Sequence, residues 1–262
     1  MKKKLPLILV ALLVIGGGIF AFTKSKSKPT ATDEPSKKKR IEEPTNIIAV
    51  ADRPYMRILP HSDGHNLNLE VVEVKKDADS VEYELEYQAG SLLQGAFGQL
   101  SIDSLPATKK ILLGSCSAGG ACTYHDDVQG GTLLTRFNSK ESYALKSRWK
   151  YIINSKGEMA FSSQDAKFQI ESKSLAKQSY LVIFNTAGYP EGLESEPVSD
   201  LYSLTSSSKL SGSGELTIRA EEEGELMIMG YDGSEWQEFK TTTEGKMATA
   251  TVDLMELYVV VK

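Results

Sequence analysis

The chain has 262 residues, of which 40% are hydrophobic and 25% are charged, a composition typical of a globular protein. Its charge is unevenly distributed: residues 1–40 contain ten Lys and Arg against two acidic residues, a net charge of +8, whereas residues 41–262 carry a net charge of −13. Because phosphate contacts need a basic surface, the acidic part argues against nucleic acid as a partner.

The N-terminal segment Leu5–Phe22 contains eighteen residues and no charge, and three lysines precede it. As a helix rising about 1.5 Å per residue it would span roughly 27 Å, close to the roughly 30 Å hydrocarbon core of a bilayer. The small residues near its end fit the cleavage pattern of a signal peptide poorly. We therefore expect residues 1–22 to be an uncleaved membrane anchor, with a cleaved signal sequence as the alternative.

The side of the membrane on which the rest of the chain lies is less clear from charge. Seven Lys and Arg follow the apolar segment between residues 24 and 40, and basic residues favour the cytoplasmic side. The short basic N-terminus resembles that of exported proteins, and the pair of cysteines described below suits an oxidising compartment. We expect a single-pass membrane protein with an extracytoplasmic, cell-surface domain; the alternative keeps that domain in the cytoplasm.

Residues 23–48 consist mainly of Lys, Ser, Thr, Pro and Glu. Such a segment buries too little apolar surface to offset the entropy lost on ordering. It is expected to be a disordered basic and proline-rich linker that holds the folded part away from the bilayer.

From residue 49 onward the hydrophobic residues tend to alternate, which is typical of strands with one solvated face. Val81–Tyr87 alternates almost strictly, and with residues 67–74 it predicts an antiparallel hairpin. Residues 90–105 are less regular and could include a helical turn. The sequence predicts an all-β fold, an antiparallel β-sandwich, over residues 49–202. Further strands are expected at residues 110–116, 132–137, 145–153, 158–161, 166–170 and 180–185.

Residues 203–262 are predicted to form a small separate β unit after a Ser- and Gly-rich stretch at 203–214. Asp232 and Gly233 form a hairpin signal, and Trp236 is expected to be buried against the strand at 257–261. Because about 60 residues are marginal for independent stability, we expect this unit to dock on the larger one or to complete its sheet.

The two cysteines of the chain, Cys116 and Cys122, are separated by five small residues that allow the close approach needed for a disulfide. The glycines within and after this stretch indicate a shaped loop, and shaped loops on rigid sheets often bind partners. The candidate binding loop comprises Ser117, Gly119, Gly120, Tyr124, His125, Asp126 and Asp127.

Three histidines suggest an alternative. His61, His65 and His125 could assemble a metal site or an enzyme active site if the fold brings them together. The chain contains no nucleophile elbow, zinc-protease or phosphate-loop motif. We therefore assign no catalytic residue and no cofactor, and favour a non-enzymatic protein.

The stretch from Lys109 to Phe137, with residues 83–98 before it, resembles uncharacterised single-span envelope proteins of candidate-phylum bacteria. The resemblance implies an extracytoplasmic β-domain and no established activity. The C-terminal pattern around Trp236 is weakly similar to immunoglobulin-like surface modules. We expect a binding or structural module of the cell envelope, with an unknown envelope or surface partner; a domain that serves only as a spacer is a further alternative.

Overall fold

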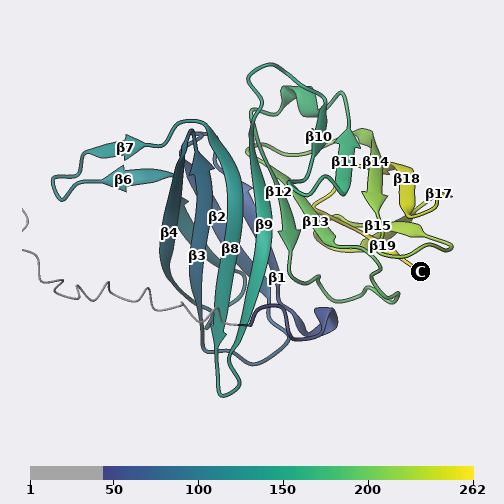
Figure 1. The fold of residues 1–262 in the computed structure, drawn as a ribbon, viewed down its shortest axis with the longest axis horizontal. Coiled ribbons are helices and arrows are strands. Elements are labelled where there is room, and N and C mark those ends of the chain that lie inside the picture. The colour runs from purple at the N-terminus through teal and green to yellow at the C-terminus, as the bar shows by residue number, and fades with distance from the viewer. Residues whose placement is uncertain (1–43) are drawn as a thin grey trace, which may run out of the picture. The chain divides into compact units, whose positions relative to one another are not determined.

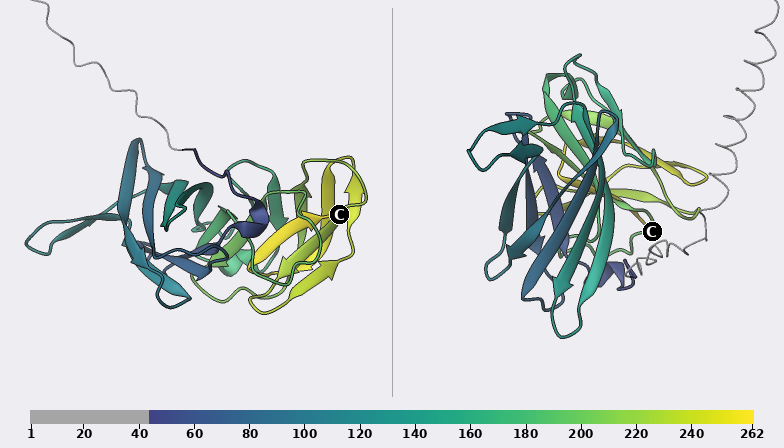
Figure 2. Two further views of the ribbon diagram at one scale, coloured as in Figure 1. Left: turned by 90° about the horizontal axis from the view of Figure 1, so that it is seen from below. Right: turned by 60° about the vertical axis from the view of Figure 1, so that its left-hand side comes forward.

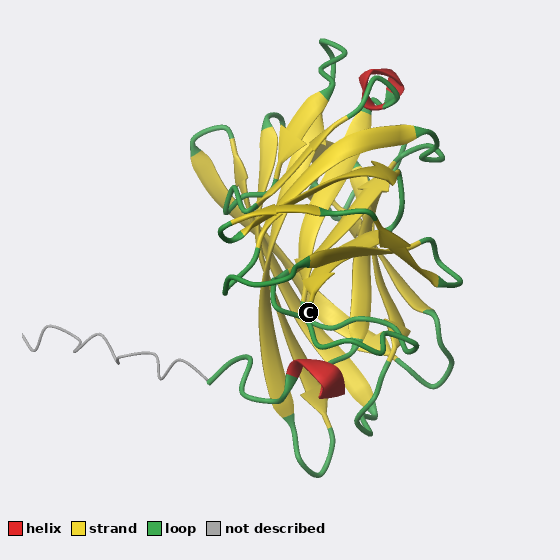
Figure 3. Ribbon diagram, turned by 90° about the vertical axis from the view of Figure 1, so that its right-hand side faces the viewer, coloured by secondary structure: helices red, strands yellow, loops and turns green. Residues whose placement is uncertain are grey.

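Residues 44–262 are described in the computed structural model of the protein, and antiparallel strands make up nearly all of their regular structure (Figures 1 and 3). This confirms the predicted all-β class. Two single-turn 3-10 helices, Val50–Asp52 and Leu175–Lys177, accompany the strands. Within this part of the chain no helix has the length and apolarity to cross a membrane. The expected anchor Leu5–Phe22 lies outside the described residues.

One nine-stranded sheet runs through the described part of the chain, and both early and late segments contribute to it. Its strands, in spatial order, are β16 (Trp236–Phe239), β15 (Met227–Tyr231), β19 (Leu257–Val261), β13 (Leu201–Ser206), β12 (Tyr180–Thr186), β9 (Tyr143–Ile153), β8 (Val128–Asn138), β3 (Ser80–Ala89) and β4 (Leu92–Ser101).

Three smaller sheets complete the fold (Figure 2). A three-stranded sheet contains β1 (Tyr55–Pro60), β2 (Asn66–Glu73) and β5 (Ala107–Leu112). A five-stranded sheet contains β10 (Ala160–Ser162), β11 (Phe168–Glu171), β14 (Ser213–Arg219), β18 (Met247–Asp253) and β17 (Thr242–Glu244). A two-stranded sheet contains β6 (Gly114–Cys116) and β7 (Cys122–Tyr124).

The two larger covering sheets pack on opposite faces of the nine-stranded sheet, and β12 shows this most directly. Successive side chains of a strand point to opposite faces. Val182 and Phe184 belong to the core beneath the three-stranded sheet, whereas Leu181 and Ile183 belong to the core beneath the five-stranded sheet. All four side chains are fully buried. Strand β12 is therefore an apolar layer shared by two cores, which explains its uninterrupted hydrophobic sequence.

A third apolar cluster covers the C-terminal part of the nine-stranded sheet on the face opposite to the five-stranded sheet. It joins Leu257, Val259 and Val261 of β19 to Tyr55 at the start of β1 and to Tyr189 in the connection before β13. Only 8% of Tyr189 is exposed, so this connection is anchored to the sheet by a buried ring.

The predicted hairpin between residues 67–74 and 81–87 is wrong, although both segments are strands. Strand β2 pairs with β1 and β5, whereas β3 pairs with β4 and β8, so the two strands belong to different sheets. Alternation identifies which face of a strand is buried, but two strands that each bury one face can equally well pair or face each other across a core.

The region 90–105, for which a helical turn was considered, contains β4, a ten-residue strand. It pairs with β3 over its whole length, from Ala89↔Leu92 to Ser80↔Ser101. Its glycines and exposed apolar residues hide the alternation on which the prediction relied.

The C-terminal segment completes the large sheet, which was one of the two arrangements expected for it; the other was docking as a separate unit. Strand β13 spans the expected boundary between residues 202 and 203, and β19 lies between β13 and β15. Ser203 and Thr205, which lie in the Ser- and Gly-rich stretch, are buried, and the Thr205 hydroxyl donates to the carbonyl of Ile58 at 2.5 Å. The position of a domain boundary stays a prediction.

The expected linker overlaps the folded part at its C-terminal end. Thr45 forms an isolated bridge with Ala144 of β9, and the Asn46 side chain exchanges hydrogen bonds of 3.0 Å with the backbone of Lys146. Residues 45 and 46 are therefore attached to β9 rather than part of a tether. Most of the expected linker, residues 23–43, lies outside the described residues.

Candidate functional site

The segment Gly114–Tyr124, with strands β6 and β7, extends away from the large sheets as a separate arm, here called the Cys hairpin (Figures 1 and 2). Its strands pair from Gly114↔Tyr124 to Cys116↔Cys122. Every residue from Ser115 to Tyr124 is exposed, and none of them carries a charge. The arm therefore presents an uncharged surface on a protein whose folded part is acidic.

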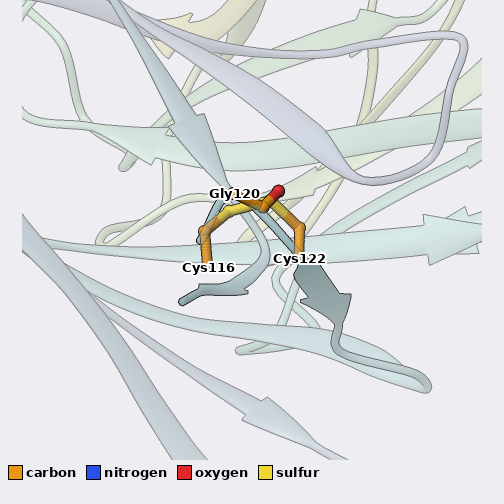
Figure 4. Close-up of a disulfide and its surroundings, with 3 residues drawn as sticks. All are labelled: Cys116, Gly120 and Cys122. Atoms are coloured by element: carbon orange, nitrogen blue, oxygen red, sulfur yellow. A yellow bond between two sulfur atoms is a disulfide. The ribbon is translucent and has the colours of Figure 1, made fainter. Parts of the chain in front are cut away.

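A disulfide joins the two strands directly below the tip (Figure 4). The sulfur atoms of Cys116 and Cys122 are 2.06 Å apart, and the Cα atoms are 4.0 Å apart. The predicted disulfide is thus present in the structure. Because its partners are opposite each other in the ladder, it holds the register of a hairpin that has no hydrophobic core of its own.

The tip of the arm is held by its own backbone. The N–H of Ser117 donates to the carbonyl of Ala121 at 2.8 Å, and the N–H of Gly120 donates to the carbonyl of Ser117 at 2.9 Å. Gly120 has φ +83°, a conformation that favours glycine. The glycine-rich sequence therefore encodes one tight turn, as expected of a shaped loop, and Gly119 and Gly120 lie at its exposed end.

At the base of the arm, backbone contacts connect it to the turn between β1 and β2. Leu113 donates its N–H to the carbonyl of His65 at 2.8 Å, and His125 donates to the carbonyl of Leu113 at 2.9 Å. A Cβ atom on Gly114 would lie 2.4 Å from the carbonyl oxygen of Thr123, so glycine is required where the two strands leave the fold.

Two aromatic contacts fix the side chains at this base. The ring of Tyr124 stacks on that of His65, with centroids 4.0 Å apart and planes 12° apart. Tyr124 remains 45% exposed on its other side. Behind it, the hydroxyl of buried Tyr87 lies 2.9 Å from Nδ1 of His125. Tyr124 is thus an aromatic group held in place beside a rigid arm, an arrangement well suited to contact a partner.

The two aspartates of the candidate loop follow the arm and lie at the start of β8. Asp127 has φ +51°, and its carbonyl accepts a hydrogen bond of 3.2 Å from Gly90 in the turn between β3 and β4. Asp126 and Asp127 are exposed, and their carboxylates make no hydrogen bond with other residues of the described range. They place negative charge at the base of an otherwise neutral arm.

The structure does not gather the three histidines into one set of ligands. His61 Nε2 lies 2.9 Å from the side-chain oxygen of Asn68, His65 stacks on Tyr124, and His125 contacts Tyr87. Among residues 44–262 no group of three or more His, Cys, Asp or Glu side chains is arranged to hold a metal ion. His65 and His125 both lie at the base of the Cys hairpin, whereas His61 contacts Asn68 of β2.

Sequence reasoning missed Tyr87, which connects the arm to the core. It was identified only as one inward residue of an alternating strand. The stacking of His65 on Tyr124 was also missed, because the two residues are 59 positions apart in the sequence. No local signal marks either contact; both follow from the way in which the β1–β2 turn meets β7.

Two cavities of the described part of the chain lie elsewhere, along β9. One of ≈ 620 Å³ is lined by residues that include Lys150, Glu158 and Phe161, and another of ≈ 310 Å³ by residues that include Arg53, Arg148 and Asp165. Charges of both signs line them, and several of these charges already have partners: Lys150 donates to the carbonyl of Ser162 at 2.9 Å. Neither cavity involves the Cys hairpin.

Comparison of the chain with protein-family models, with curated proteins and with solved structures finds no match. The resemblance to envelope proteins therefore stays a prediction.

Proposed function

We propose that this protein is a membrane-anchored, extracytoplasmic binding module of the cell envelope, which contacts a partner through the Cys hairpin and Tyr124. The observation that carries the proposal is the exposed arm, closed by the disulfide and standing clear of the sheets. Ordering a flexible loop on binding costs about 0.5–1.5 kcal/mol for each immobilised side chain, and an arm that is already ordered avoids much of this cost.

The surface chemistry of the arm indicates the kind of contact that it would make. Its tip offers backbone groups and small side chains from Ser117 to Ala121, and Tyr124 adds one large amphipathic ring. Tyrosines of this kind are frequent at binding hot spots because they bury much area with little rotamer entropy. A neutral polypeptide or glycan surface fits the arm better than a strongly charged one.

The extracytoplasmic location is supported by two features together. A disulfide on an exposed arm is stable in an oxidising compartment and rare in the cytosol. The apolar segment Leu5–Phe22 has the length of a membrane anchor. Thiol labelling tests the location: Cys116 and Cys122 should resist alkylation in intact cells until a membrane-impermeant reductant is added. Free thiols before reduction would contradict it.

Contact through the arm can be tested with a photo-reactive amino acid at Ala118. Irradiation of cells that make the full chain should give a discrete adduct, and the additional change Tyr124→Ala should abolish it. The matched control carries the same group at Lys140, in the exposed turn at the far end of β8. The same adducts from both positions would contradict the proposal.

A further inference from the structure

Strand β4 is an open edge of the nine-stranded sheet. It pairs with β3 on one side, and none of its backbone groups has a partner on the other side among residues 44–262. Natural sheets protect such edges with charges, prolines, bulges or short strands. Strand β4 has none of these: its ten residues contain no charge and no proline, and its pairing with β3 shows no shift of register.

The outward face of this edge is apolar and exposed. Phe97 is 85% exposed, the largest exposed fraction of any large hydrophobic residue in the described range, and Leu93 is 67% exposed. Gly95 lies between them on the same face, because alternate residues of a strand share a face. A partner strand at this edge would therefore meet two apolar side chains with a gap between them.

Nothing within residues 44–262 requires glycine at position 95. A Cβ atom there would meet only the carbonyl oxygen of Leu85, at 3.6 Å, an ordinary contact, and its φ is not in the left-handed region. Gly98 differs, since its Cβ would lie 2.7 Å from the hydroxyl of Tyr83. Glycine weakens a strand interior unless another group approaches it closely. The gap at Gly95 thus indicates an approach from outside the molecule.

We propose that β4 pairs antiparallel with β4 of a second copy of this chain, which joins the two nine-stranded sheets edge to edge. A two-fold axis perpendicular to the sheet leaves the solvent-exposed faces of both sheets on the same side. Residues of that face in one β4 strand therefore lie opposite residues of the same face in the other. With the axis at Ala96, Phe97 of each copy lies against Gly95 of the other. Aromatic side chains stabilise edge glycines in this way, and the strand is complementary to itself.

The charge distribution supports a second copy as the occupant. Residues 41–262 are acidic overall, so most pairs of surfaces from two copies repel each other, and the uncharged edge is an exception. Glu82, Glu84 and Glu86 lie one strand inside the edge. In the proposed pair the equivalent glutamate strands would be about 14 Å apart, three strand spacings, which exceeds the screening length of about 8 Å at physiological salt.

The Cys hairpin projects on the same side as this edge but starts from one end of it (Figure 1). Its base meets the turn between β3 and β4, where Gly90 bonds to Asp127, so it lies at the Leu92 end of the strand. Two ten-residue strands bury less than the roughly 1,200 Å² of stable complexes. The expected dimer is therefore weak and concentration-dependent, and covalent trapping is the suitable test.

The native cysteines are paired with each other, so one introduced cysteine can report on the contact. With the axis at Ala96, the two Ala96 Cα atoms would be about 4.5 Å apart, within the range of a disulfide. Mild oxidation of full-length Ala96→Cys should give a reducible dimer. Gln99→Cys is the matched control on the same strand; its two copies would be about 20 Å apart. It should give no more dimer than the unmodified chain.

Two further variants separate specific pairing from general stickiness. In the Ala96→Cys background, Phe97→Ala should abolish the dimer because it removes the inserted ring, and Gly95→Val should abolish it because it fills the gap while Phe97 remains. Ile153→Ala, which alters an exposed apolar residue of β9, should leave the dimer unchanged. An unchanged unfolding midpoint confirms that each variant folds. Equal trapping at Ala96 and Gln99, or a dimer that survives Gly95→Val, would overturn the proposal.

Discussion

The hydroxyl of Tyr87 lies 2.9 Å from Nδ1 of His125, and this contact connects the interior of the fold to the base of the Cys hairpin. Tyr87 is 1% exposed and also packs edge-on against Trp149. Burial raises the pKa of Tyr87 above its ordinary value of 10.0, so the phenol keeps its proton at neutral pH. The orientation of the hairpin base is thus set from within the core.

Removal of that hydroxyl should loosen the base of the arm without disrupting the core. We expect Tyr87→Phe to lower the free energy of unfolding by about 1 kcal/mol, the usual net value of such a hydrogen bond, and to speed amide hydrogen exchange near His125. Chemical denaturation and hydrogen exchange measure both effects. Tyr83→Phe is the control, because Tyr83 faces the same core and its hydroxyl makes no hydrogen bond in the described part of the chain. Equal effects of the two variants would contradict the assigned role of Tyr87.

Loss of the disulfide should affect the arm far more than the fold. Its loop spans six residues in sequence and lies outside the hydrophobic cores. For so short a loop, the loss of chain entropy corresponds to about 2 kcal/mol at most. We expect the double variant Cys116→Ser, Cys122→Ser to unfold in one cooperative transition, with a free energy of unfolding lowered by no more than that amount. We also expect its arm to become sensitive to limited proteolysis. If the variant lost its cooperative transition, the disulfide would have a larger role in the fold than its position indicates.

Asp165, in the turn between β10 and β11, should make the fold sensitive to acid. Desolvation acts to raise the pKa of its carboxyl, but hydrogen bonds from Ser163, Lys167, Asn185 and Tyr202 outweigh it and hold the pKa below 3.8. The charged form is therefore favoured in the folded state. Its contribution to stability is present above the ordinary carboxyl pKa and is lost as the pH falls through the lowered value.

The measurement is the free energy of unfolding as a function of pH, from about pH 6 down to about pH 2. We expect Asp165→Asn to cost about 1–3 kcal/mol at neutral pH, because donors that face the carboxylate lose their acceptor. The same variant should also show a smaller decrease in the free energy of unfolding as the pH falls. Asp126→Asn, which removes a charge on the exposed loop, should do neither. An acid profile of Asp165→Asn that parallels the unmodified protein would rule out this carboxyl as the cause.

The shared strand β12 predicts that the two cores unfold together. Val182 and Ile183 are neighbours in sequence but face different cores. Truncation of either to Ala removes fully buried methyl groups, and for Ile183 the expected cost is about 2–5 kcal/mol. Because the apolar residues 181–184 of β12 alternate between the two cores, both variants should lower the midpoint of one common transition. Two separate transitions in calorimetry would show that the halves are independent.

The strands of this fold follow from the sequence more readily than their partners do. Val81–Tyr87 alternates because one face of β3 is buried and the other solvated, and β19 is continuously apolar because both of its faces are buried. Periodicity carries no information on which neighbour a strand meets, so the pairing of β2 with β3 was predicted wrongly. Strand β13 escaped prediction because its Ser203 and Thr205 belong to a Ser-rich stretch that is typical of an exposed connection, yet both are buried, and the Thr205 hydroxyl donates to the carbonyl of Ile58.

The candidate site was predictable in part for a similar reason. The disulfide follows from the short spacing of Cys116 and Cys122, a local property, and so does the tight turn at Gly120. The contacts of His65 with Tyr124 and of Tyr87 with His125 depend on strands that are distant in sequence. Gly95 could not be singled out from the sequence, since only the free space around it in the structure distinguishes it from Gly98.

The place of β19 in the large sheet has a consequence for the order of assembly during synthesis. Strand β19 is inserted between β13 and β15, and Leu257, Val259 and Val261 cover Tyr55 from the first strand. A nascent chain that has not yet reached residue 257 therefore has a gap within its sheet and lacks part of the apolar cluster that contains Tyr55. The sheet therefore cannot be completed step by step from the N-terminus during synthesis. An exported chain would need protection from aggregation until β19 has crossed the membrane.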